Sequence, residues 1–142
     1  MMITPRRDVL ISLVSSALLT TISPRIYFYG PVTRSSCSSL MYDLLEFDSF
    51  RTDSSPPIHV HVKSEGGDYR PMINTIGLIR SEIKTPIWTF VDGVSIGPSS
   101  LLVVSGKKRF MTPTSTLGFG GMRGYGPDEC IRKGFVDQVV IR

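Results

Sequence analysis

The sequence predicts an α/β domain built on a mostly parallel sheet. Short runs of β-branched and aromatic residues alternate with longer segments whose apolar residues recur at helical spacing, and glycine or proline separates most of them. Helices between successive strands allow right-handed crossover connections, which pair the strands in parallel. A length of 142 residues suits one domain with a substantial core, and no repeat or second domain is visible.

The first predicted strand is RIYFYG (25–30), a β-branched and aromatic run that a glycine ends. Residues 36–47 form the first predicted helix of the domain, with its apolar positions at Leu40, Met41, Leu44 and Leu45. The segment FRTDSSPP (50–57) has the composition of a loop. The first strand and helix are therefore expected to end before residue 50.

A second strand, IHVHVKS, is expected to run into the glycine turn SEGGD. Pro71 is expected to open the next helix, because a proline lacks only an N–H that a first helical turn leaves unused. The predicted buried stripe of that helix is Met72, Ile73, Ile76, Ile79 and Ile83.

PIWTFVDG (86–93) predicts a third strand, and residues 98–105 a short, nearly all-apolar buried helix that Gly106 caps. KRFMTPTSTLGFGG predicts a fourth strand broken by Pro113. A last short helix is expected over residues 128–133.

The first 24 residues allow two interpretations. Their apolar stretch, 9–22, is too short and too rich in serine and threonine to span a membrane. It fits an amphipathic helix, because its apolar residues fall on one face. The pair Arg6-Arg7 before an apolar run also fits a targeting or export segment. Both interpretations stay open.

Composition excludes several classes of function. The net charge of +4 comes from scattered basic residues without the accompanying aromatic pattern of a nucleic-acid surface, so no nucleic-acid partner is expected. Cys37 and Cys130 lack CxxC spacing, which favours a reducing compartment. No Walker-type glycine loop or metal-ligand motif occurs, and no cofactor is expected.

Four motifs, taken in order, resemble the proteolytic subunit of the Clp protease. IHVHVKSEGG is similar to that family's strand and Ser-Pro-Gly-Gly turn. VDGVSIGPSSLLVVSGKKRFMTPTSTLGF is similar to its strand, nucleophile turn, buried helix, Gly-Lys-Arg-Phe segment and Pro-x-Ser strand. PDECIRKGFVDQVV is similar to the closing segment. The resemblance implies a ClpP/crotonase-like head domain over residues 25–142, made of repeated βα units, with the family's handle region missing between about 121 and 128.

The resemblance also implies that the peptidase site is empty. Matched without gaps from Gly106, the nucleophilic serine falls on Gly97 and the residue after it on Pro98. The family's histidine falls on Gly120, and its aspartate lies in the missing handle region. The oxyanion positions fall on Gly67, which keeps its amide, and Pro98, which has none.

Other residues of this region have plainer interpretations. Ser95 and Ser99 are the alternative nucleophiles if the match slips, although the only histidines, His59 and His61, lie on another strand. These histidines point to one face of that strand, and a metal site there lacks a third ligand. Asp68 and Asp92 flank glycine turns and are interpreted as turn or cap residues.

The resemblance implies a non-catalytic subunit or paralogue of the Clp proteolytic core, with a structural or regulatory role in its ring, similar to the R-type members of mixed rings. Its implied partners are other Clp proteolytic subunits in a hetero-oligomeric ring and, through them, a Hsp100-type ATPase. Its implied compartment is a plastid stroma or a bacterial-type cytoplasm. Because handles join two rings, a chain without one is expected to enter a ring without forming a double ring.

Three alternatives remain, so whether the chain is an enzyme stays open at this point. One is an active Clp-type serine endopeptidase with a non-standard site. Another is a crotonase-like fold for acyl-thioester chemistry, against which Pro98 counts. The last is a truncated gene product without a stable role.

Overall fold

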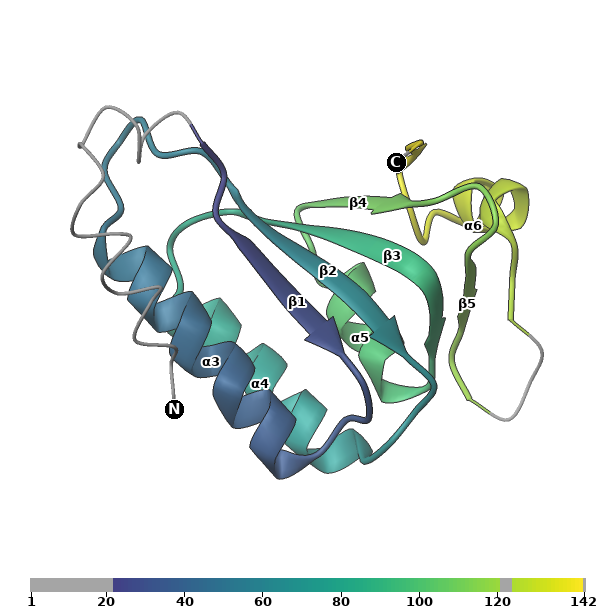
Figure 1. The fold of residues 1–142 in the computed structure, drawn as a ribbon, viewed down its shortest axis with the longest axis horizontal. Coiled ribbons are helices and arrows are strands. Elements are labelled where there is room, and N and C mark those ends of the chain that lie inside the picture. Colours follow the sequence, from purple (N-terminus) through teal and green to yellow (C-terminus); the bar gives the residue numbers. More distant parts are fainter. Residues whose placement is uncertain (1–21, 121–123, 142) are drawn as a thin grey trace.

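The computed structural model describes residues 22–120 and 124–141, and in them a twisted sheet is covered by helices on one face (Figure 1). The strands lie in the order β1, β2, β3, β4 and β6, and β5 pairs with the far end of β3. Every pairing of these strands is parallel. The predicted mostly parallel α/β fold is therefore confirmed. The strand bounds are β1 Arg25–Tyr29, β2 Ile58–Ser64, β3 Ile87–Ile96, β4 Lys108–Met111, β5 Thr116–Gly118 and β6 Gln138–Val139.

The helices are α3 (Arg34–Ser49), α4 (Tyr69–Glu82), α5 (Pro98–Val104) and α6 (Pro127–Lys133). Thr33 caps α3, since its hydroxyl accepts a hydrogen bond from the Ser36 amide while the Ser36 hydroxyl accepts one from the Thr33 amide. The expectation that Pro71 opens a helix is wrong by two residues. Asp68 in extended backbone precedes α4, so Tyr69 is its first residue.

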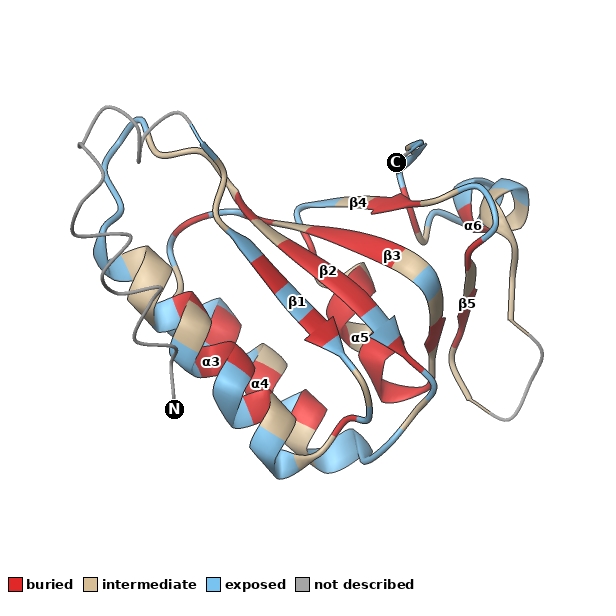
Figure 2. Cartoon of the chain, in the orientation of Figure 1, coloured by how far each residue is buried: buried red, intermediate tan, exposed pale blue. Residues whose placement is uncertain are grey.

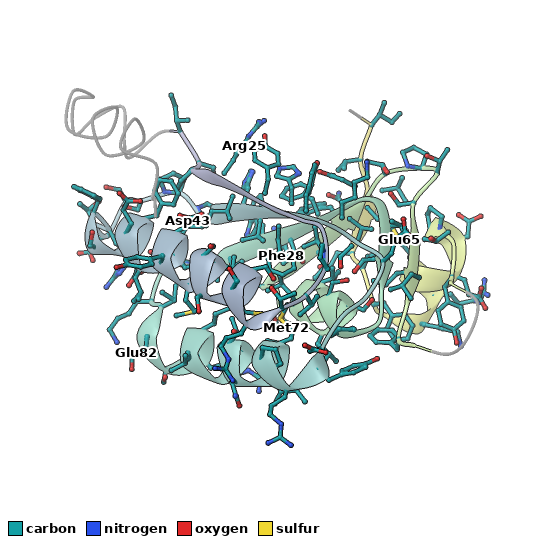
Figure 3. The ribbon with its side chains drawn as sticks, turned by 60° about the horizontal axis from the view of Figure 1, so that its bottom comes forward. Arg25, Phe28, Asp43, Glu65, Met72 and Glu82 are labelled. Atoms are coloured by element: carbon teal, nitrogen blue, oxygen red, sulfur yellow. The ribbon has the colours of Figure 1, made fainter. Side chains whose placement is uncertain are left out.

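The core lies between the sheet and helices α3, α4 and α5 (Figure 2). On β1, side chains alternate between buried and exposed, as in a strand with one covered face. Figure 3 shows Phe28 of β1 and Met72 of α4 in the space between the sheet and the helices, where both are buried. Burial of this face supplies most of the free energy that holds the layers together.

One predicted buried position is wrong, because Ile73 is 56% exposed. Leu45, one of the apolar positions of the first predicted helix, is also exposed, at 45%. Each directly follows a buried residue, and one residue turns a helix by about 100°, which carries the next side chain away from the sheet. Cys37 and Thr75 are buried instead.

Strand β3 continues beyond the predicted end at Gly93, reaching Ile96. Gly93 has φ 99°, and beyond it β3 pairs with β5 instead of β4. The predicted break at Pro113 is confirmed, because residues 112–115 separate β4 from β5. Ser115 fixes this break, since its hydroxyl donates to the Val91 carbonyl and accepts from the Gly93 amide.

Residues 119–126 alone join β5 to α6. Leu117 and Tyr125 form an antiparallel bridge with N–O distances of 2.9 and 2.7 Å, so the chain turns back directly after β5. This short link agrees with a head domain that lacks the handle. The predicted N-terminal segment, 1–24, lies outside the described residues except for 22–24. No helix within 22–120 or 124–141 combines the length and hydropathy that crossing a membrane requires.

Candidate active site

The turn between β3 and α5, Gly97-Pro98, forms the corner at which we predicted the nucleophile's position. Gly97 has φ 76° and ψ −134°, a conformation that favours glycine. Its amide donates to the Gly118 carbonyl at 2.9 Å, which joins the corner to β5. Both Gly97 and Pro98 are buried. A Cβ on Gly97 would lie 3.8 Å from its nearest neighbours, so the corner has room for a small side chain although none is present.

The predicted histidine position, Gly120, lies close to this corner. A Cβ on Gly120 would lie 2.7 Å from the Tyr69 hydroxyl, and the same hydroxyl lies 3.8 Å from a Cβ built on Gly97. The Tyr69 hydroxyl donates a 2.7 Å hydrogen bond to the Phe119 carbonyl. The structure therefore brings the two predicted positions together, with a tyrosine hydroxyl beside both. Sequence reasoning missed Tyr69 because its partner is 50 residues away along the chain.

The glycine turn after β2 supplies the remaining predicted oxyanion position. Val32 donates to the Gly66 carbonyl and accepts from the Asp68 amide, both at 2.9 Å, and this bridge leaves the Gly67 amide outside the sheet. A Cβ on Gly67 would lie 2.2 Å from the Val32 carbonyl oxygen, so only glycine fits. Glu65 at this turn is exposed (Figure 3). It lines an open groove together with Lys63 and Tyr29.

The alternative nucleophiles Ser95 and Ser99 are fully buried. Their hydroxyl oxygens lie 2.7 Å apart, and the Ser95 hydroxyl also lies 3.3 Å from that of Ser100. Ser100 donates to the carbonyls of Ser95 and Gly118. These hydroxyls satisfy one another and nearby carbonyls around the start of α5, and their hydrogen-bond partners do not include a histidine.

The two histidines share one face of β2, as their spacing predicted, and this is the face away from the helices. Here aromatic rings from four strands pack against one another in stacked, tilted and edge-to-face contacts: Tyr27, Tyr29, His59, His61, Trp88, Phe90 and Phe110. Burial lowers the pKa of His59, and the nearby His61 and Arg25 lower it further. No group of three His, Cys, Asp or Glu side chains in the described ranges could hold a metal ion.

The interpretation of Asp92 as a turn or cap residue is wrong, because β3 continues through it. Its carboxylate accepts from the Tyr29 hydroxyl at 2.6 Å and lies 3.0 Å from Nδ1 of the buried His61. Asp68 does precede a helix, but its side chain makes no capping hydrogen bond. Sequence reasoning missed the His61–Asp92 pair because it paired each residue with its chain neighbours.

The comparisons agree with this fold. The family model described as Clp protease matches residues 10–118. The crystal structure of the ClpP protease catalytic domain from Plasmodium falciparum superposes with a TM-score of 0.76 at 16% identity, over 99% of this chain and 94% of that one. No curated protein sequence matches the chain. The identity to the solved structure supports the fold alone, whereas the family model spans most of the sequence. The chain belongs to the Clp protease family.

Proposed function

We propose that this chain is a non-catalytic subunit or paralogue of the Clp proteolytic core, with a structural or regulatory role in the ring. The observation that carries the proposal is the corner Gly97-Pro98. Acyl transfer by a serine requires a hydroxyl, a base and donors for the oxyanion. Gly97 has no hydroxyl, and Pro98 has no N–H to donate.

The expected loss of rate is large. Removing a serine triad lowers kcat by a factor on the order of 10⁶. Losing one oxyanion donor typically lowers it by a further 10²–10³, roughly. The amide of Gly67 stays outside the sheet hydrogen bonds and would be the one donor left. Ser95 and Ser99 are buried and hydrogen-bonded to each other, which argues against either serine as a replacement nucleophile.

The proposed partners are other Clp proteolytic subunits in a mixed ring, and through them a Hsp100-type ATPase. The fold supports this, because it provides a complete head with a short link, 119–126, where other members carry a handle. We therefore expect this chain to enter a ring and to contribute little to contacts between two rings. A plastid stroma or a bacterial-type cytoplasm is the proposed compartment.

The test is co-expression of the full chain with a catalytically complete Clp proteolytic subunit that carries a different affinity tag. We expect the two chains to co-purify through either tag. A fluorophosphonate probe should then label the complete subunit and leave this chain unlabelled, because the probe reacts with an activated serine hydroxyl. The purified chain alone should not hydrolyse a fluorogenic peptide.

Three outcomes would contradict the proposal. Labelling of this chain would indicate an active site, and the variants Ser95→Ala and Ser99→Ala would then show which hydroxyl reacts. Failure to co-purify would remove the ring role. A stable double ring of this chain alone, by light scattering, would contradict the part assigned to the short link.

A further inference from the structure

Tyr69 occupies an unusual place for the first residue of a helix. It opens α4 two residues after Gly67, and its ring reaches across the corner to Phe119, the first residue after β5. There its hydroxyl donates to the Phe119 carbonyl at 2.7 Å. The ring thus spans from the glycine turn to the link after β5 that carries the predicted histidine position, Gly120, while 41% of the residue's surface stays exposed.

The two glycines at the ends of this span differ in how they meet Tyr69. At Gly97 the hydroxyl lies 3.8 Å from the place of a Cβ, an ordinary contact distance. At Gly120 it lies 2.7 Å away, closer than a Cβ can approach, and the ring carbon Cζ is the next atom at 3.8 Å. A side chain at Gly120 would therefore require the Tyr69 hydroxyl to move away, and among the described residues, the chain neighbours of Gly120 apart, no other atom lies so close.

We propose that Tyr69 closes the corner between α5 and β5, so that the space in which a nucleophile and base would meet admits neither a histidine nor the acyl group of a peptide. This deepens the proposed function, on which it rests only for the assignment of Gly97 and Gly120. The tyrosine and Gly120 form a coupled pair, since a base at position 120 requires the hydroxyl to leave. The burial of Gly97 at the end of β3 agrees with this closure.

The first experiment places a thiol at the corner. In the full-length variant Gly97→Cys, the rate at which iodoacetamide alkylates the new thiol measures access to the position of the nucleophile. Cys37 and Cys130 are buried and should react slowly, and the wild-type chain measures their contribution. Adding Tyr69→Ala should raise the alkylation rate of the new thiol by roughly tenfold or more, because opening no longer has to displace the ring.

The matched control is Tyr42→Ala, which removes an exposed tyrosine on α3 and should leave the alkylation rate of the new thiol unchanged. Equal alkylation rates with and without Tyr69→Ala, in chains that remain folded by circular dichroism, would overturn the proposal. An equal increase with Tyr42→Ala would do the same, since it would show a general loosening of the fold.

The second experiment needs no side chain at position 97 and decides the matter if Gly97→Cys does not fold. Gly120→Ala is introduced into the wild-type chain and into the variant Tyr69→Phe, and the unfolding equilibrium constant is measured in urea. In the wild-type background the new methyl group must break the hydrogen bond of the Tyr69 hydroxyl. In the Tyr69→Phe background only the backbone strain at φ 108° remains. The effect of Gly120→Ala should therefore be several-fold larger in the wild-type background, within the range of directly coupled pairs of about two- to a hundredfold.

Equal effects of Gly120→Ala in the two backgrounds would overturn the coupling. Both experiments use the isolated chain and measure neither ring assembly nor hydrolysis. A negative result in these experiments would therefore not affect the proposal of a ring subunit, which co-purification tests. A negative result in the co-purification would likewise not affect the proposed closure by Tyr69.

Discussion

Replacing Gly67 with alanine should destabilise the fold much more than replacing its neighbour Gly66. Both glycines have positive φ, 143° and 136°, so an alanine at either position bears similar backbone strain of roughly 1–3 kcal/mol. They differ in their surroundings. No atom lies within 4 Å of a Cβ on Gly66, whereas a Cβ on Gly67 would lie 2.2 Å from the carbonyl oxygen and 2.5 Å from the nitrogen of Val32.

The overlap at Gly67 involves backbone atoms, which no rotamer change can move. Relief requires the segment carrying Val32 to separate from the turn, and this breaks the two 2.9 Å hydrogen bonds of the Val32 bridge. Each such bond is worth a net 0.5–1.5 kcal/mol, roughly, and the fully buried Val32 side chain must also shift. Gly67→Ala should therefore exceed Gly66→Ala by about 2–4 kcal/mol in the free energy of unfolding, a large part of the roughly 5–15 kcal/mol that holds a typical domain folded.

Urea unfolding followed by circular dichroism measures this difference, with the wild-type chain and Gly66→Ala as references. If the two variants have the same midpoint, the Val32 bridge does not hold the turn, and the argument that Gly67 is fixed by close backbone contact is wrong. A larger effect at Gly66 would contradict the described turn as a whole.

The remaining predictions concern the core, the sheet face and a thiol. Met72→Ala should lower the free energy of unfolding by about 2–5 kcal/mol, because the Met72 side chain is fully buried. Ile73→Ala, on the exposed side of the same helix, should change the free energy of unfolding by less than about 0.5 kcal/mol. Comparable effects of the two variants in urea unfolding would contradict the described helix face. The folded state lowers the pKa of His59, so as the pH falls through about 6.5 the unfolded chain binds a proton at this residue before the folded chain does. The free energy of unfolding should therefore decrease below that pH, and His59→Gln should reduce this decrease. Unchanged pH dependence in that variant would show that His59 is not responsible. Burial, with the neighbouring Glu129 carboxylate, raises the pKa of Cys130 to about 11, so its thiol should resist iodoacetamide at pH 8 until urea unfolds the chain, and rapid native labelling would contradict its burial.

Local sequence patterns predicted the elements of the fold well. The β-branched and aromatic run RIYFYG corresponds to β1, and Pro98 begins α5 as expected, although α5 ends at Val104 with Ser105 in place of Gly106 as its C-cap. Such signals act over a few residues, so they survive without knowledge of the partner. The error at Ile73 has the opposite origin, because whether an apolar residue of a helix is buried depends on where the neighbouring helix and sheet lie.

The candidate site was predictable only in part. The match of motifs indicated which residues would stand at the corner, and the structure brings Gly97 and Gly120 to one place. The match of motifs could not indicate that Tyr69 lies between Gly97 and Gly120, since nothing near Tyr69 in the sequence points to Phe119. For the same reason the sequence could not indicate the pairing of Asp92 with His61, because the register between β2 and β3 brings these two residues together.

The wholly parallel pairing of the described strands has a consequence for how fast the chain folds. Among the described strands, no two neighbours in the sheet are joined by a short hairpin. A helix lies in the chain between β1 and β2, another between β2 and β3, and another between β3 and β4. Each crossover closes a long loop before its hydrogen bonds form, which slows folding relative to proteins rich in local contacts. During that delay the apolar strands stand unprotected against aggregation. The yield of this protein in a cell is therefore expected to depend on the chaperones that attend its folding as well as on the stability it finally reaches.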